Sequence, residues 1–112
     1  MTKFRDAFDA KIWQAVSRIP VGQVVSYGEV AAAAGFPRYA RMVAGAMSRS
    51  PKPLPWYRVV RADRTLAFAP GSESYRKQAQ LLKQEGVLFE SNKVVTAEPE
   101  NSLDRILWGP VG

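Results

Sequence analysis

The chain has 112 residues, 46% of them hydrophobic and 23% charged, with a formal net charge of +6. This length allows one domain over residues 1–112 with a single core, and no apolar run approaches the ~20 residues that cross a bilayer. The chain has no cysteine and no histidine, which removes thiolate nucleophiles, zinc–sulfur sites and the usual proton carrier near pH 7. We therefore expect no catalytic residues, metal or cofactor. Charged residues interrupt the first turns, where a signal peptide is apolar, so we expect a cytoplasmic protein.

The positive charge is concentrated in the middle of the chain. Residues 38–64 hold seven cations against a single acidic residue, Asp63. The cations are Arg38, Arg41, Arg49, Lys52, Arg58, Arg61 and Arg64. Arginine is well suited to phosphate groups, so this cluster favours a polyanion partner, above all nucleic acid. The alternative is a solvated surface that only aids solubility.

The first predicted element is an amphipathic helix over residues 4–18. Phe4, Phe8 and Ile12 recur there at helical spacing, and this apolar stripe is expected in the core. Residues 20–22 (PVG) end the helix. The two valines that follow predict a short strand or extended entry.

A helix-turn-helix pattern comes next. Ser26 and Glu29 match a capping box at the start of a short helix, and Gly35 suits the left-handed turn that ends it. Pro37 is well suited to the first turn of a second helix, which we expect to run to about Ser48. Such helix pairs are common, but this second helix opens the basic segment, which favours a DNA-binding role.

Small side chains are unusually frequent on that second helix. Ala40, Ala44 and Gly45 surround Arg41, which we expect to face solvent. Small residues allow the helix backbone to come close to a partner. Tight packing on a neighbouring helix is an equally good explanation for Ala40 and Ala44.

Prolines control the next segment. Residues 51–55 (PKPLP) cannot form a regular helix, because each proline restricts itself and its predecessor. We expect this stiff segment to hold Trp56 in a fixed position. A short strand is predicted directly after it, over residues 58–60. A turn-like stretch over residues 61–71 follows.

The last predicted elements are a third long helix and a hairpin. Ser72 or Ser74 caps this helix, and Gly86 ends it. A small hairpin is predicted within residues 87–95. Residues 97–112 are weakly patterned, and we expect a C-terminal extension that packs back as a short helix or lies loosely on the surface.

Four segments share a pattern with one protein family. They are residues 24–31 (VVSYGEVA), 40–47 (ARMVAGAM), 55–60 (PWYRVV) and 82–87 (LKQEGV). In order and spacing they resemble the DNA-binding domain of O6-alkylguanine-DNA alkyltransferases, over a core of about residues 4–90. The resemblance implies a mainly α fold with small β elements, a winged helix-turn-helix-like DNA-binding domain.

The sequence departs from that family at the reactive position. The family signature is Pro-Cys-His-Arg-Val, in which Cys accepts the alkyl group and His activates it, whereas this chain has Trp56 and Tyr57. An indole is no nucleophile at neutral pH, so the resemblance does not extend to alkyl transfer. It extends to the alkyltransferase-like proteins, which carry Trp at this position. Members of that group bind O6-alkylguanine in duplex DNA, flip it out and direct it to nucleotide excision repair.

The resemblance also implies how DNA would be bound. The helix that begins near Pro37 would enter the minor groove, which is only ~6 Å wide and favours small side chains. Arg41 would fill the gap left by the flipped base, and Tyr27 would help to rotate the target nucleotide. A phosphate contact or a solvated side chain is the alternative for Arg41, and a half-buried helix-start residue is the alternative for Tyr27. The predicted DNA-binding residues are Tyr27, Arg38, Arg41, Ala44, Gly45 and Arg49.

A lesion pocket is implied beside the replaced cysteine. Trp56 would form part of its wall, although simple core filling is the alternative for an indole. Arg58 is either a phosphate contact or a structural residue that ties the Trp56 segment down. The loop that follows offers only apolar side chains around Phe68, so selectivity would depend on backbone groups and shape. The predicted pocket residues are Trp56, Tyr57, Val59 and Phe68.

We therefore expect a monomer that binds double-stranded DNA containing O6-alkylguanine, recruits nucleotide excision repair proteins and is associated with the nucleoid if bacterial. The first alternative is a helix-turn-helix transcription regulator that binds undamaged DNA. The second is a residual enzyme. That enzyme would need a proton acceptor near Trp56, for which the sequence offers Tyr57 and Glu85.

Overall fold

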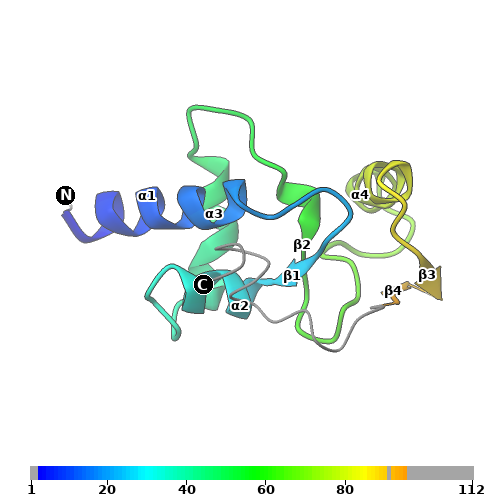
Figure 1. Ribbon diagram of the computed structural model, residues 1–112, viewed down its shortest axis with the longest axis horizontal. Helices are drawn as coiled ribbons and strands as arrows, with labels where there is room; N and C mark the ends of the chain where they lie inside the picture. Colours follow the sequence, from blue (N-terminus) through cyan, green and yellow to red (C-terminus); the bar gives the residue numbers. More distant parts are fainter. Residues whose placement is uncertain (1–2, 91, 96–112) are drawn as a thin grey trace, which may run out of the picture.

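The computed structural model describes residues 3–90 and 92–95, so the predicted C-terminal extension lies outside the described residues. The helices are α1 (Lys3–Ser17), α2 (Tyr27–Ala33), α3 (Val43–Ser48) and α4 (Glu73–Gln84), with 3-10 turns η1 (Ala40–Met42) and η2 (Trp56–Arg58). The strands are β1 (Val25–Ser26), β2 (Val59–Val60), β3 (Phe89–Glu90) and β4 (Lys93–Val94). Helices α1, α2 and α3 gather at one end of the molecule, and α4 lies with β3 and β4 at the other (Figure 1).

A short parallel ladder joins these two ends. β1 pairs with β2, with Val25 opposite Val59 and Ser26 opposite Val60. Val25 and Val59 belong to a core cluster with residues of α1, α2 and α3, whereas Val24 and Val60 belong to a second cluster with residues of α4 and the hairpin. Because successive strand residues point to opposite faces, the ladder supplies apolar side chains to both clusters.

The predicted N-terminal helix over residues 4–18 is confirmed, since α1 begins and ends within one residue of those bounds. Phe8 and Ile12 are completely buried in the first cluster. The indole nitrogen of Trp13 donates a 2.6 Å hydrogen bond to the carbonyl of Ala46 in α3. Asp9, which is also buried, accepts two hydrogen bonds from Arg49 at 2.7 and 2.8 Å. Helix α1 therefore fixes α3 through both apolar and polar contacts.

The capping box of α2 is confirmed in full. The Ser26 hydroxyl accepts from the amide of Glu29 at 3.1 Å, and the Glu29 carboxylate accepts from the amide of Ser26 at 2.8 Å. Gly35 ends the helix with φ 95°, in the left-handed region that favours glycine.

The predicted start of the second helix at Pro37 is wrong. The chain turns after Gly35, winds as a 3-10 helix from Ala40, and becomes α-helical only at Val43. The Phe36 ring packs edge-on against Phe8, with centroids 5.1 Å apart, and the amide of Tyr39 bonds to the Phe36 carbonyl at 3.0 Å. Packing of this partly buried aromatic side chain against the first core cluster favours a turn here, so the helix starts later.

The C-terminal half follows the prediction more closely. Ser72 is the cap of α4, since its hydroxyl accepts from the amide of Tyr75 at 3.1 Å. β3 and β4 form the predicted antiparallel hairpin. The structure is thus mainly α with small β elements, as expected. None of the helices within the described residues has the length and apolarity needed to cross a membrane.

Candidate nucleic-acid interface

Five of the six residues predicted to contact DNA lie on α3 or close to it in the chain: Arg38, Arg41, Ala44, Gly45 and Arg49. Arg38, Arg41 and Ala44 are exposed, which confirms the expected orientation of Arg41. A Cβ added at Gly45 would meet only the far end of the Arg49 side chain, 3.4 Å away. Packing against the described residues therefore does not require glycine at position 45. This part of the surface combines small side chains with exposed guanidinium groups.

Tyr27 is half-buried at the start of α2. Burial raises the pKa of its hydroxyl, and the nearby positive charge of Arg61 opposes this effect only in part. The hydroxyl therefore stays protonated at neutral pH and is able to donate a hydrogen bond to an acceptor such as a phosphate oxygen.

The seven cations of residues 38–64 divide into two sets. Three form ion pairs within the protein: Arg49 with Asp9, Arg58 with Glu85 and Arg64 with Glu29. The other four are exposed and have no carboxylate partner in the described part of the chain: Arg38, Arg41, Lys52 and Arg61. Arg49 still has 36% of its side chain exposed, so its predicted DNA contact stays a prediction.

Three of the four predicted pocket residues form an aromatic group, which we define as Trp56, Tyr57 and Phe68. The Trp56 ring lies edge-on to Tyr57, with centroids 5.6 Å apart, and edge-on to Phe68, with centroids 6.0 Å apart. Trp56 and Tyr57 are partly exposed, and Phe68 is 37% exposed. The indole is therefore not sealed in the core.

Val59 does not join this group. Its side chain is completely buried in the first core cluster, where it pairs across the ladder with Val25. The inward face of a two-residue strand accounts for this placement. As a structural residue, Val59 anchors the turn that carries Trp56.

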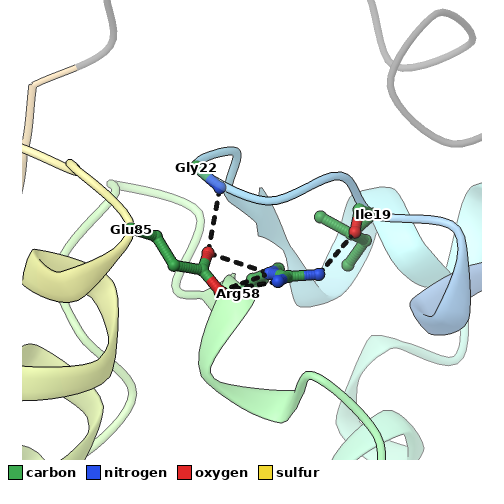
Figure 2. Close-up of polar contacts among 4 residues, drawn as sticks. All are labelled: Ile19, Gly22, Arg58 and Glu85. Atoms are coloured by element: carbon green, nitrogen blue, oxygen red, sulfur yellow. Dashed lines mark hydrogen bonds and ion pairs between the residues drawn. The ribbon is translucent and has the colours of Figure 1, made fainter.

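Arg58 ties this turn to two other parts of the chain (Figure 2). Its guanidinium donates to the Glu85 carboxylate at 2.6, 3.0 and 3.2 Å and to the Ile19 carbonyl at 2.8 Å. The same carboxylate accepts from the amide of Gly22 at 2.9 Å. Both charged side chains are almost buried, with 11% and 12% exposed. Of the two roles predicted for Arg58, the structure shows the structural one.

Glu85 is poorly suited to act as a base. Burial alone would raise the pKa of its carboxyl, but the hydrogen bonds from Arg58 and Gly22 outweigh this effect and hold the pKa below its ordinary value. Burial raises the pKa of Tyr57, whose ring lies 5.4 Å from the Arg58 guanidinium carbon. The two proton acceptors that the sequence offers are thus a weakly basic carboxylate and a protonated phenol.

Gln78 is the residue of this region that the sequence analysis missed. It is completely buried in α4 and donates to the carbonyls of Tyr57 and Val59 at 3.1 and 3.0 Å. It also accepts from the amide of Ala67 at 3.0 Å. One side chain thereby joins the Trp56 turn to the loop that carries Phe68. Its only signal in the sequence is its place one turn before Leu82, on the buried face of the helix.

Comparison with known proteins identifies the family. Residues 7–87 match the family model described as the 6-O-methylguanine DNA methyltransferase DNA-binding domain. The chain belongs to this family. Its relatives include a DNA base-flipping protein of Escherichia coli, 38% identical over 105 residues that cover 92% of this chain and 75% of the relative. Alkyltransferase-like protein 1 of Schizosaccharomyces pombe is 36% identical over 107 residues, which cover 94% of this chain and 97% of that protein.

Solved structures of the family agree with this fold. S. pombe Atl1, in complex with damaged DNA containing O6-carboxymethylguanine, matches with a TM-score of 0.67 and 34% identity, over 94% of this chain and 97% of that chain. Mycobacterium tuberculosis OGT in complex with DNA matches with a TM-score of 0.59 and 32% identity, over 76% of this chain and 50% of that chain. The matched fold therefore includes both an alkyltransferase-like protein and a methyltransferase.

Proposed function

We propose that this protein binds O6-alkylguanine in double-stranded DNA, turns the alkylated nucleotide out of the helix and does not repair it. The observation that carries the proposal is Trp56, a partly exposed indole held beside Phe68 in a chain without cysteine. The relatives named base-flipping protein and alkyltransferase-like protein, and the complex of Atl1 with damaged DNA, support it.

The aromatic group supplies what an extruded base needs. Extruding a base costs a few kcal/mol of stacking and pairing, which contacts to the extruded base and to the gap must offset. Stacking of one base on an aromatic side chain contributes ~1–3 kcal/mol. An alkyl group on the base adds apolar surface that an indole face contacts favourably.

The surface around α3 fits the minor groove. Ala44 and Gly45 allow close approach of the helix, and among the described residues only the far end of the Arg49 side chain would meet a Cβ at position 45. Arg41 is free to enter the base stack, where a planar guanidinium both stacks and donates hydrogen bonds. Tyr27 is half-buried with a protonated hydroxyl, and we propose that this hydroxyl donates to a phosphate oxygen.

A protein that binds a lesion without chemistry needs a later repair step. We propose that the bound complex, acting as a cytoplasmic monomer, passes the lesion to nucleotide excision repair proteins. Support for this step comes from the absence of a thiol acceptor, since the chain has no cysteine.

The test compares two duplexes that differ only in one O6-methylguanine. We expect tighter binding to the alkylated duplex in a titration at fixed salt, and an unchanged lesion by mass spectrometry after long incubation. Equal affinity for the two duplexes would leave the alternative of a regulator that binds undamaged DNA. Loss of the methyl group from the DNA would show that the protein is an enzyme.

A further inference from the structure

Arg64 has an unusual backbone conformation. Its φ is 72°, and it is the only residue other than glycine with a positive φ among the described residues. An L-residue with a side chain is strained in this region, whereas glycine is not. A residue that stays strained is held by its surroundings, and such residues concentrate at functional sites.

Contacts of the Arg64 side chain hold the residue in this backbone conformation. Its guanidinium donates to both oxygens of Glu29, at 2.9 and 3.3 Å. Glu29 is the capping-box residue of α2, and its Oε1 also accepts from the amide of Ser26. Burial favours the neutral carboxyl, but hydrogen bonds from Arg64 and Ser26 hold the pKa of Glu29 below its ordinary value. One carboxylate thus joins Arg64 to the start of α2, where Tyr27 lies.

The backbone of Arg64 joins two more elements. Its amide donates to the Arg61 carbonyl at 2.8 Å and closes the turn that follows β2. Its carbonyl accepts from the amide of Val94 in β4 at 2.9 Å. Four residues further along the chain, Phe68 contacts Trp56. The position of Phe68 therefore depends on a turn that is fixed to the hairpin by backbone bonds and to α2 by the Arg64 side chain.

We propose that Arg64, through its ion pair with Glu29, is a positioning residue that holds the Phe68 loop against Trp56 and sets the preference for an alkylated base. This inference rests on the proposed function and names a specificity determinant for it. It assigns Arg64 a role different from the phosphate contact that its charge alone would predict. The pair joins two parts of the candidate site, because Glu29 lies in α2, which begins at Tyr27, and Arg64 lies in the loop that carries Phe68.

Two variants break the pair and change the charge in opposite directions. Arg64→Gly removes a cation and relieves the positive φ, so the fold is retained and the melting temperature stays within a few degrees of the parent protein. Glu29→Gln removes an anion and keeps the capping box, because glutamine also accepts from the Ser26 amide. Its amide nitrogen would replace Oε2, which lies 3.3 Å from the Arg64 guanidinium, so two donors would repel each other there, and Oε1 would accept from Arg64 as a neutral oxygen.

The readout is the ratio of affinities for the alkylated and unmodified duplexes at fixed salt. We expect this ratio to fall at least about threefold in both variants, as for couplings through packed networks. We expect affinity for the unmodified duplex to fall or stay constant in Arg64→Gly and to rise or stay constant in Glu29→Gln. Amide hydrogen exchange of residues 65–69 should become faster in both variants, whereas exchange in α1 stays unchanged.

The possible outcomes distinguish failure of this inference from failure of the proposed function. A parent protein without preference for the alkylated duplex overturns the proposed function. A parent protein with such a preference, and two variants that retain its ratio, overturns the inference alone. An equal loss of affinity for both duplexes in Arg64→Gly, with the ratio retained, shows that Arg64 is a phosphate contact instead.

Discussion

Trp56 combines two properties that a wall for an extruded base needs. It is partly open to solvent, and the turn that carries it is fixed on several sides. Gln78 bonds to the carbonyls that follow it, and Arg58 joins the same turn to Glu85 and Ile19. A wall that is already ordered loses little conformational entropy when a base binds.

Replacement of this indole should remove lesion preference. In Trp56→Ala we expect a loss of ~1–3 kcal/mol in binding of the O6-methylguanine duplex, the contribution of one base stacked on an aromatic ring. Affinity for the unmodified duplex should change little, because phosphate contacts supply nonspecific binding. Fluorescence anisotropy with both duplexes measures the two effects.

Trp56→Phe is the matched control, since it keeps an aromatic face at the same position. It should retain most of the preference that Trp56→Ala loses. Equal losses on both duplexes in Trp56→Ala would contradict a role of Trp56 in the lesion pocket.

Of the three ion pairs described above, the pair between η2 and the C-terminal cap of α4 is the most buried. Arg58 and Glu85 are nearly buried, and removal of one partner from such a pair leaves the other uncompensated, at a cost of roughly 3–5 kcal/mol. Glu85→Gln should therefore lower the free energy of unfolding by about that amount at pH 7. Urea titration followed by circular dichroism measures the change.

The pH dependence of this effect has a defined sign. The folded pKa of Glu85 lies below its ordinary value, so its stabilising contribution is complete above the ordinary pKa of a glutamate and is lost as the pH falls through the folded pKa. The difference in free energy of unfolding between the parent protein and Glu85→Gln should therefore become smaller in that acid range. The exposed Glu90→Gln is the control, and a gap that stays constant with pH would contradict the role assigned to Glu85.

Local rules predicted most of these elements. The capping box of α2 and the left-handed Gly35 depend on neighbours within a few residues, so the sequence was sufficient. The start of the second helix depends instead on Phe36, whose ring packs against Phe8 some 28 positions earlier in the numbering. A turn-and-proline pattern carries no information about that distant contact, and the prediction failed there.

The candidate site shows the same difference: features that depend on neighbouring residues were predictable, and features that depend on residues far apart in the sequence were not. The motif that holds Trp56 was apparent in the sequence, and the structure brings Trp56, Tyr57 and Phe68 together. Gln78 was missed, because a glutamine on a helix is usually solvated, and only the fold shows the carbonyls that it meets. The carboxylate partners of the arginines were also beyond prediction, since they lie 27 to 40 residues away.

For the whole molecule, the charge available to a polyanion is smaller than the composition indicates. Seven cations lie within residues 38–64, but three of them are neutralised by carboxylates of the same chain. Each phosphate that is neutralised contributes about −0.9 to the slope of log affinity against log salt. The slope measured with an unmodified duplex should therefore lie near about −3 to −4, instead of about −6 for the full cluster.

Titrations at several salt concentrations measure this slope. A value near about −6 would show that the ion pairs open when DNA binds and release their arginines to phosphates. A flat response would contradict the involvement of the basic segment altogether.

The parallel ladder between β1 and β2 limits how the site is able to adapt. Tyr27 follows β1 directly, and the Trp56 turn precedes β2 directly, so the register of Val25 opposite Val59 fixes their separation. Both faces of this ladder are packed, because Val25 and Val59 lie in the first core cluster and Val60 lies in the second. The backbone at Tyr27 is thereby tied to the backbone of the turn that carries Trp56. Under the proposed function, we expect tolerance for alkyl groups of different size to depend on the loop after β2, so that variation in that loop changes which adducts are bound.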